Sequence, residues 1–179
     1  NLATDSRNCG ACANSCAPIS DRLGTLHSCQ ASVCRPLNDR CAGAEVINLA
    51  AGARISLSAN TSTALHDIDP PCRATTSPDV YFTFTLTQRE LVYANTFGAT
   101  WDTVLFFASS CTAGLTGSTT PGDAVCNDDA SGAGCASGGT TSVVMAALNP
   151  GTYYLVLSGY NGASGRVTSM VTFSPGHGR

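Results

Sequence analysis

The sequence contains no lysine, and only 12% of its 179 residues are charged. The fixed positive charge comes from nine arginines that are scattered singly along the chain, and the formal net charge is −3. A nucleic-acid-binding surface needs basic residues gathered on one face, and attraction to an anionic membrane surface needs the same clustering. We therefore expect neither nucleic acid nor an anionic membrane surface as a partner.

Long apolar runs are also absent, since none approaches the roughly 20 residues that cross a bilayer as a helix. We therefore expect no membrane insertion. The chain begins at Asn1 without a methionine or a signal sequence. For that reason we expect it to be a processed piece of a longer precursor.

The sequence signatures of catalysis are missing as well. The three histidines, His27, His66 and His177, lie far apart in unlike contexts, and neither H-E-x-x-H nor G-x-S-x-G occurs. Catalysis needs a base beside a nucleophile, or a metal with an open coordination position. A triad assembled by the fold stays open from sequence alone, but we expect the protein not to be an enzyme.

Cysteine, by contrast, is abundant, with ten residues. In an oxidising compartment such cysteines form disulfides, so we expect a secreted, extracellular or cell-surface protein. Zinc is the alternative for Cys9-x₂-Cys12, but zinc sites usually come as two regular cysteine pairs and the spacings here are irregular. Five cysteines fall in the first 34 residues and five follow: Cys9, Cys12, Cys16, Cys29 and Cys34, then Cys41, Cys72, Cys111, Cys126 and Cys135.

From about Cys41 onward, short apolar runs alternate with residues that favour turns. In residues 79–87, Val80, Phe82, Phe84 and Leu86 alternate with a tyrosine and threonines, a period of two that is typical of a half-buried antiparallel strand. Further strands are predicted at residues 46–49, 54–58, 90–97, 103–108, 142–148, 152–158 and 166–173.

No segment has a helical period. About eight short strands with turns between them predict an all-β fold, and favour a two-sheet antiparallel β-sandwich of jelly-roll type over a barrel. The cysteine-rich start lacks the aromatic and β-branched residues that build a core, so cross-links must hold it. We expect a disulfide-stapled N-terminal segment over residues 1–37 and the sandwich over residues 38–175.

Two stretches resemble known families. Residues 1–16, NLATDSRNCGACANSC, resemble the cysteine-rich repeat of stigma-specific-type proteins, which recurs in large surface proteins of myxobacteria; Ala13 departs where that repeat has glycine. The residues that match the repeat are Asp5, Asn8, Cys9, Gly10, Cys12 and Cys16.

Residues 38–173 resemble bacterial pre-peptidase C-terminal (PPC) domains. The resemblance implies a β-sandwich attached to secreted enzymes or surface proteins, where it helps in binding, secretion or assembly. The matching pieces are NDRC (38–41), DVYF (79–82), WDTVLFF (101–107), CNDD (126–129) and PGTYYLVLSGY (150–160).

Within the sandwich we prefer the pairings Cys41–Cys72 and Cys111–Cys126, which leave Cys135 over. Because each half of the chain holds an odd number of cysteines, the halves cannot both pair internally. Either one disulfide crosses between the halves, or two cysteines bond other chains or stay free.

Carboxylates gather in two of the segments that resemble the PPC domain. Asp102 and the run Asn127-Asp128-Asp129 are candidate ligands for Ca²⁺, which takes six to eight oxygen ligands and is abundant outside cells. The alternative is that these residues build a turn through side-chain hydrogen bonds to the backbone. Asp67 and Asp69, before two prolines, are expected to lie in a solvated loop.

Trp101 and Tyr160 are candidates for stacking against a polysaccharide, although packing between the sheets is the alternative for both. Two functions follow. The first is a non-catalytic structural or adhesive module of a bacterial surface fibre or matrix, which associates with itself or with other extracellular surface components. The second is an accessory domain of a secreted hydrolase that binds carbohydrate or protein.

Overall fold

A computed structural model describes residues 1–16, 27–49, 54–116, 124–130 and 139–173, and describes residues 168–173 by their backbone only. These residues form strands and two short 3-10 turns. None of the described residues belongs to a helix that is long and apolar enough to cross a membrane.

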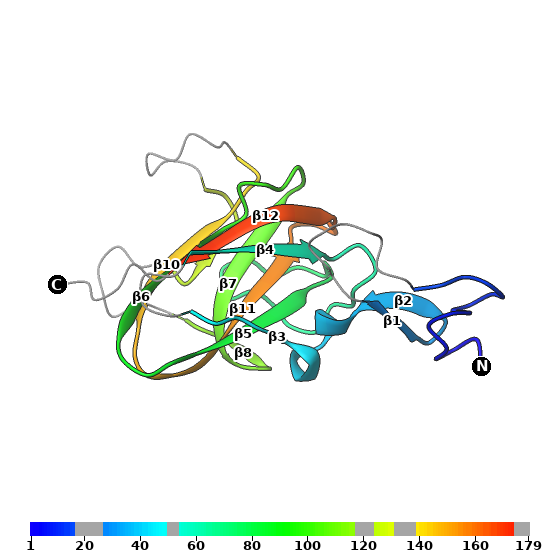
Figure 1. Cartoon of the computed structure of the whole chain (residues 1–179). Coiled ribbons are helices and arrows are strands. Elements are labelled where there is room, and N and C mark those ends of the chain that lie inside the picture. Colours follow the sequence, from blue (N-terminus) through cyan, green and yellow to red (C-terminus); the bar gives the residue numbers. More distant parts are fainter. Residues whose placement is uncertain (17–26, 50–53, 117–123, 131–138, 174–179) are drawn as a thin grey trace.

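Two sheets packed face to face form the body of the molecule (Figure 1). Successive long strands alternate between the sheets, as expected for the predicted jelly-roll-like sandwich. One sheet has the order β10 (Val143–Leu148), β6 (Glu90–Asn95), β12 (Arg166–Phe173), β4 (Arg54–Asn60). The other has the order β3 (Glu45–Val46), β5 (Val80–Leu86), β11 (Gly151–Gly159), β7 (Thr103–Ser110), β8 (Ala113–Gly114), and β9 (Cys126–Asn127) also pairs with β7.

Among the described strands, the pairing is antiparallel except between β3 and β5. β3 runs parallel to β5, where Glu45 lies opposite Phe82 and Val46 opposite Thr83. The prediction of an antiparallel sandwich is therefore confirmed for the long strands and wrong for this short edge.

The main core lies between the sheets. The period of two in β5 points Val80, Phe82, Phe84 and Leu86 inward, and all four are buried. They meet inward residues of β6, β7, β10 and β11, and Phe84 packs edge-to-face on Phe107 with ring centroids 6.2 Å apart. Burial of the apolar side chains in such a core is the main favourable contribution to the free energy of folding.

A second, smaller core covers the opposite face of the β5–β11–β7 sheet. Tyr81, Phe106 and Val156 are fully buried there, together with Ile68. The cover comes from the irregular segments on either side of β4, which include the 3-10 turns η1 (Leu37–Asp39) and η2 (Cys41–Gly43). At the Tyr81 end, β5 is thus buried on both faces, where its alternation predicted a half-buried strand.

Two disulfides fasten this cover to the sheet. Cys41 in η2 pairs with Cys111 at the end of β7, and Cys72 pairs with Cys126 in β9, which itself pairs with β7. The predicted pairs Cys41–Cys72 and Cys111–Cys126 are therefore wrong. The turns η1 and η2 contact β5, and the two disulfides join the covering segments to the β7 side of the sheet and not to each other.

The N-terminal segment has a disulfide core in place of an apolar one. Cys9–Cys29 and Cys16–Cys34 link residues 1–16 to a hairpin of β1 (His27–Gln30) and β2 (Val33–Pro36). The side chains of Asp5 and Asn8 cap the loop, since Asp5 accepts the Arg7 N–H and Asn8 accepts the Ala13 N–H, each at 2.9 Å. Ala13 has φ +63°, a conformation that favours the glycine of the stigma-specific-type repeat.

The four disulfides among the described residues each stay within one half of the chain. Cys12 is exposed and has no disulfide partner among the described residues. Cys135 lies outside the described residues. The described structure therefore has no disulfide that crosses between the halves, and the fate of the two remaining cysteines stays a prediction.

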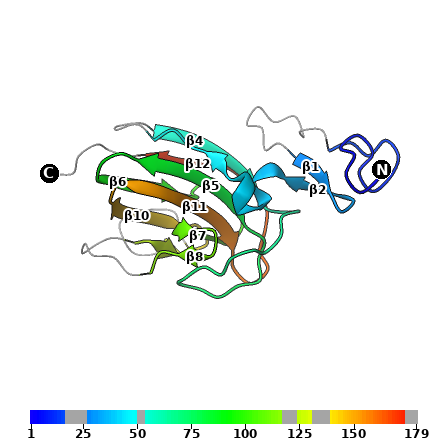
Figure 2. The ribbon, with the colours of Figure 1, turned by 90° about the horizontal axis from the view of Figure 1, so that it is seen from below.

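The β1–β2 hairpin lies beyond one end of the sandwich (Figure 2). It contacts the loop after β4, where Thr63 Oγ1 donates to the Cys34 carbonyl and Arg35 Nη1 donates to the Thr63 carbonyl, each at 2.6 Å. Arg166 pairs with Asn60 near this loop, while Phe173 pairs with Arg54 at the other end of β4. The hairpin and the end of β12 therefore lie at opposite ends of the molecule (Figure 1).

Replacing both Cys41 and Cys111 by serine should lower the free energy of unfolding by about 4 kcal/mol, because the bond closes a loop of 70 residues in the unfolded chain. The corresponding fall in Tm is on the order of 10 °C for a chain of this size. Calorimetry measures it. Cys12→Ser, which removes an exposed thiol with no disulfide partner among the described residues, is the control and should lower Tm much less. A non-reducing peptide map that joins Cys41 to Cys72 would contradict this pairing.

Candidate functional site

The predicted acidic residues meet where β7 begins and β9 ends. Asp102 directly precedes β7, and Asp128 and Asp129 directly follow β9. Because β9 runs antiparallel to β7, with Asn127 opposite Leu105, the two loops lie side by side. One carboxylate oxygen of each of Asp102, Asp128 and Asp129 lies within 4.8 Å of the others. We call these three residues the surface acidic cluster.

The surface acidic cluster is short of hydrogen-bond donors. The Oδ1 atoms of Asp102 and Asp128 are buried and have no hydrogen-bond partner among the described residues. Burial raises the pKa of both carboxyls, the charge of Asp129 raises it further, and the positive charge of Arg73 opposes the rise. A bound cation would offset the cost of holding these charges together.

Asn127, the fourth predicted ligand, has another role. Its Oδ1 accepts the N–H of Val143 at 2.9 Å, and its Nδ2 donates to the Asp129 carbonyl at 3.1 Å. The amide therefore ties the loop to β10 and supplies the turn-building hydrogen bonds of the alternative interpretation. The surface acidic cluster is left with three carboxylates.

Arg73 belongs to this site and was missed by the sequence analysis. Its Nε lies 3.0 Å from Asp128 Oδ2, and its guanidinium lies 4.3 Å above the centre of the Tyr160 ring. Arg73 follows Cys72, whose disulfide to Cys126 brings it beside the loop after β9. The position of Arg73 follows from the Cys72–Cys126 pairing, which the sequence analysis did not predict.

The two aromatic candidates lie beside the surface acidic cluster, and both are used in packing. Trp101 Nε1 donates to the Arg166 carbonyl at 3.0 Å. Its ring lies so close to Gly165 that a Cβ there would come within 2.6 Å of Trp101 Cδ1. The Tyr160 ring stacks under the Arg73 guanidinium, and the backbone N–H of Tyr160 donates to the Asp102 carbonyl at 3.1 Å. The polysaccharide platform stays a prediction, with one face of each ring already occupied.

Three carboxylates from two loops suit a Ca²⁺ ion whose remaining ligands are water. Arg73 is an internal competitor, because it already neutralises part of Asp128. The structure thus brings Asp102, Asp128 and Asp129 together as the sequence suggested, and calcium binding there stays a prediction.

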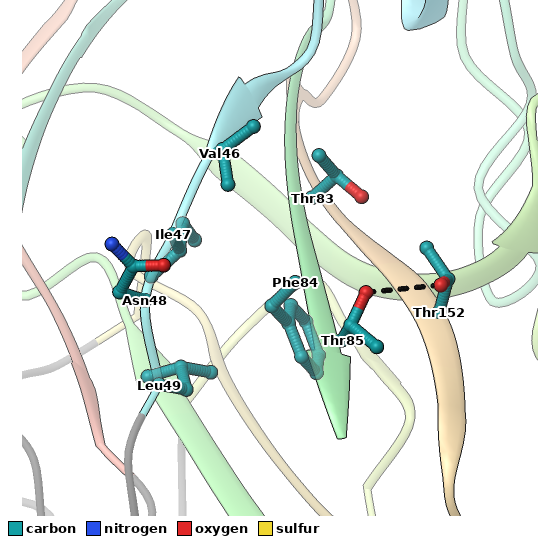
Figure 3. Close-up of a pocket in the computed structure, with 8 residues that line it drawn as sticks. All are labelled: Val46, Ile47, Asn48, Leu49, Thr83, Phe84, Thr85 and Thr152. Carbon is teal, nitrogen blue, oxygen red and sulfur yellow. Dashed lines mark hydrogen bonds between the residues drawn. The ribbon is translucent and has the colours of Figure 1, made fainter. Parts of the chain in front are cut away.

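An open groove of about 530 Å³ lies at the β3 edge of the same sheet (Figure 3). Residues 46–49 form one wall, and Thr83 and Thr85 of β5, with Thr152 of β11, form the other. The hydroxyls of Thr85 and Thr152 lie 3.0 Å apart in a hydrogen bond. The groove is part apolar and part hydroxyl-lined, and the sequence analysis did not find it because it depends on how β3 diverges from β5.

His66 is one of the two histidines among the described residues, and His177 lies outside them. Its Nδ1 lies 3.1 Å from the Ser77 carbonyl and 3.5 Å from Asp79 Oδ2, and its Nε2 lies 3.4 Å from Asp69 Oδ1. Both ring nitrogens thus face oxygens that accept hydrogen bonds, an arrangement that suits a structural histidine. The absence of enzyme activity stays a prediction.

Terbium, which occupies calcium sites, should emit when it is excited through Trp101, the single tryptophan of the chain and the neighbour of Asp102. We expect Ca²⁺ to quench this emission by competition and Asp102→Asn to abolish it. The control Asp69→Asn changes an exposed carboxylate outside the cluster and should retain it. Emission that is absent, or that Ca²⁺ does not displace, would show that the loop is a turn alone.

With any bound cation removed by a chelator, the folded protein should become less stable as the pH rises and the carboxyls of the surface acidic cluster lose their protons. A raised pKa in the folded state means that the folded protein holds protons that the unfolded chain has already lost. The stability contributed by the protonated carboxyls is therefore present at low pH and is lost as the pH rises through their folded pKa values. Thermal unfolding across this range should show a smaller fall in Tm for Asp102→Asn than for the wild type. Parallel curves would argue against coupling at Asp102.

No protein-family model matches the chain, and no curated protein matches it either. The resemblances of residues 1–16 and 38–173 therefore stay predictions. The case for function rests on the geometry of the disulfides, the surface acidic cluster and the groove.

Proposed function

We propose that the chain is a non-catalytic structural or adhesive module of the bacterial cell exterior, part of a surface fibre or matrix. The observation that carries the proposal is the Cys41–Cys111 disulfide, which covalently joins the segment after the N-terminal hairpin to the end of β7. The four disulfides among the described residues are typical of an oxidising compartment, which supports an extracellular location.

The arrangement suits a module that bears load. The hairpin lies at one end of the sandwich and β12 ends at the other, so a pull along the chain crosses the whole sandwich. A force on the N-terminal segment passes through Cys41 to β7, which lies next to β11 within the sheet, before it can peel away the cover. Covalent links at this position keep the second core closed under tension.

The groove offers a place for contact between copies. The Ile47 N–H donates to the Thr83 carbonyl, so the backbone groups of Thr83 point toward β3. Backbone groups two residues apart in a strand point to the same side, so those of Thr85 also face the groove, beyond the end of β3. Val46 is 71% exposed at its rim. A strand of a second copy could add to β5 here, as edge strands commonly allow.

The same groove favours the second candidate function, an accessory domain that binds carbohydrate or protein. Its threonine hydroxyls could hydrogen-bond a sugar, and its open strand edge could bind an extended peptide. The two functions differ in the occupant of the groove: another copy of the chain, or a foreign ligand.

Light scattering, with and without reductant, tests the proposal together with a glycan-binding assay. We expect concentration-dependent self-association that Thr85→Pro weakens at least tenfold, because proline removes the outward N–H while sparing the bonds to β11. Thr85→Val keeps that N–H and is the matched control. A strictly monomeric protein that binds a glycan tightly would refute the structural function in favour of the accessory one.

A further inference from the structure

Four cysteine sulfurs form the core of the N-terminal segment. Cys9 is fully buried, Cys16 and Cys29 are each 5% exposed, and the partly buried Cys34 packs against them. The Sγ atoms of Cys9, Cys16 and Cys29 all lie within 4.8 Å of one another. The Sγ atom of Cys34 is bonded to that of Cys16, so all four sulfurs are gathered in one place.

The sulfurs come in equal number from two parts of the segment. Cys29 and Cys34 lie directly opposite each other on β1 and β2, whereas Cys9 and Cys16 belong to the loop of residues 1–16. Each disulfide joins one hairpin cysteine to one loop cysteine. Reduction of both disulfides therefore leaves two thiols on the loop beside two thiols on the hairpin.

Contacts that do not involve sulfur also hold the loop against the hairpin. The Cys29 N–H donates to Ser6 Oγ, and the Ser32 N–H donates to the Ala3 carbonyl, each at 3.3 Å. Gly10 lies so close to the hairpin turn that a Cβ there would come within 2.6 Å of the Ser32 carbonyl oxygen. These contacts favour the same arrangement of loop and hairpin when the disulfides are open.

The arrangement suits a tetrahedral zinc site. Zn²⁺ binds thiolate sulfur at about 2.3 Å, which places the four sulfurs of a tetrahedral site roughly 3.8 Å apart. The Sγ atom of Cys16 already lies within 4.8 Å of those of Cys9 and Cys29. After reduction, the two sulfurs of each former disulfide need only separate to the same spacing.

The ligand spacing along the chain is also compatible with zinc. Four residues separate Cys29 from Cys34 on the hairpin, a spacing that zinc-binding cysteine pairs use. Cys12, the zinc candidate beside Cys9 in the sequence, is exposed, whereas Cys16 belongs to the buried group. The structure therefore puts Cys16 in the place that the sequence offered to Cys12.

We propose that Cys9, Cys16, Cys29 and Cys34, when reduced, form a buried site for one Zn²⁺ ion. A dithiol reductant supplies the two electrons and two protons that break each S–S bond, and it closes to a cyclic disulfide. Zn²⁺ then binds the four protein sulfurs as thiolates and releases four protons to the solvent. The same sulfurs thus close the segment covalently when oxidised and by coordination when reduced.

The N-terminal segment needs such a cross-link more than the sandwich does. Its buried cluster consists of cysteines, whereas the sandwich has an extensive apolar core. Small segments without an apolar core usually need disulfides or a metal to fold. Zinc should therefore restore the structure of this segment in the reduced chain. The site is separate from the surface acidic cluster and does not depend on the proposed structural role.

Co²⁺, which occupies zinc sites and absorbs visible light in a tetrahedral field, is the probe. The full chain is reduced with a phosphine, which becomes its oxide and avoids the zinc binding of dithiols, and is then kept free of oxygen. We expect one Co²⁺ per chain with the charge-transfer absorption of four thiolates, and displacement by Zn²⁺. The oxidised chain should lack this absorption, which separates the site from the carboxylates of the surface acidic cluster.

Two serine variants identify the ligands. Cys16→Ser should weaken Co²⁺ binding at least tenfold and lower the charge-transfer absorption by about a quarter, because one of four thiolates is lost. Cys12→Ser is the matched control and should retain both the affinity and the absorption. Zinc should also slow tryptic cleavage after Arg7 in the reduced wild type and in Cys12→Ser, but not in Cys16→Ser.

The proposal is overturned if the reduced wild type shows no tetrahedral thiolate absorption, or if Cys16→Ser leaves the affinity and the absorption unchanged. Loss of binding in Cys12→Ser would also contradict it, since the ion would then belong to Cys9 and Cys12. None of these results depends on whether the protein self-associates, so the proposed function is tested separately.

Discussion

The structure depends on closing the second face of the β5–β11–β7 sheet. Tyr81, Phe106 and Val156 are large, fully buried and on the side away from the partner sheet. Their burial requires a cover, and the regular structure in the described part of that cover consists of the 3-10 turns η1 and η2 and the short strand β3. Cys41–Cys111 and Cys72–Cys126 supply what regular hydrogen bonding does not, because each fixes one covering segment to the β7 side of the sheet.

Two groups of polar side chains lie at this cover. Beneath it lie the buried carboxylates of Asp39 and Asp79, which are shielded from water by the packing that the disulfides maintain. At its far end, Cys72–Cys126 brings Arg73 over Tyr160 and against Asp128, beside the surface acidic cluster. The disulfides therefore determine the surroundings of these charged groups. Chemical reduction of Cys41–Cys111 and Cys72–Cys126 should expose the buried carboxylates to water and release Arg73 from the surface acidic cluster.

The local pattern of the chain predicted most of the strands, because a period of two reports which residues can share one face. The segment 79–87 is β5 almost residue for residue, and the carboxylates of Asp102, Asp128 and Asp129 meet as proposed. Other features escaped it. The double burial of Tyr81, the amide of Asn127 turned to β10, and the position of Arg73 all depend on segments that are far apart in the chain.

The sequence by itself determined the all-β class, the strand positions and the reliance on disulfides, since these follow from local alternation and from the number of cysteines. Only the tertiary structure decided which cysteines pair and which carboxylates are buried. The sequence analysis preferred Cys41–Cys72, whereas the fold brings Cys41 to Cys111 at the end of β7 and Cys72 to Cys126 in β9. Pairing and burial are set by distances in space, and the connections between strands make those distances unrelated to separation along the chain.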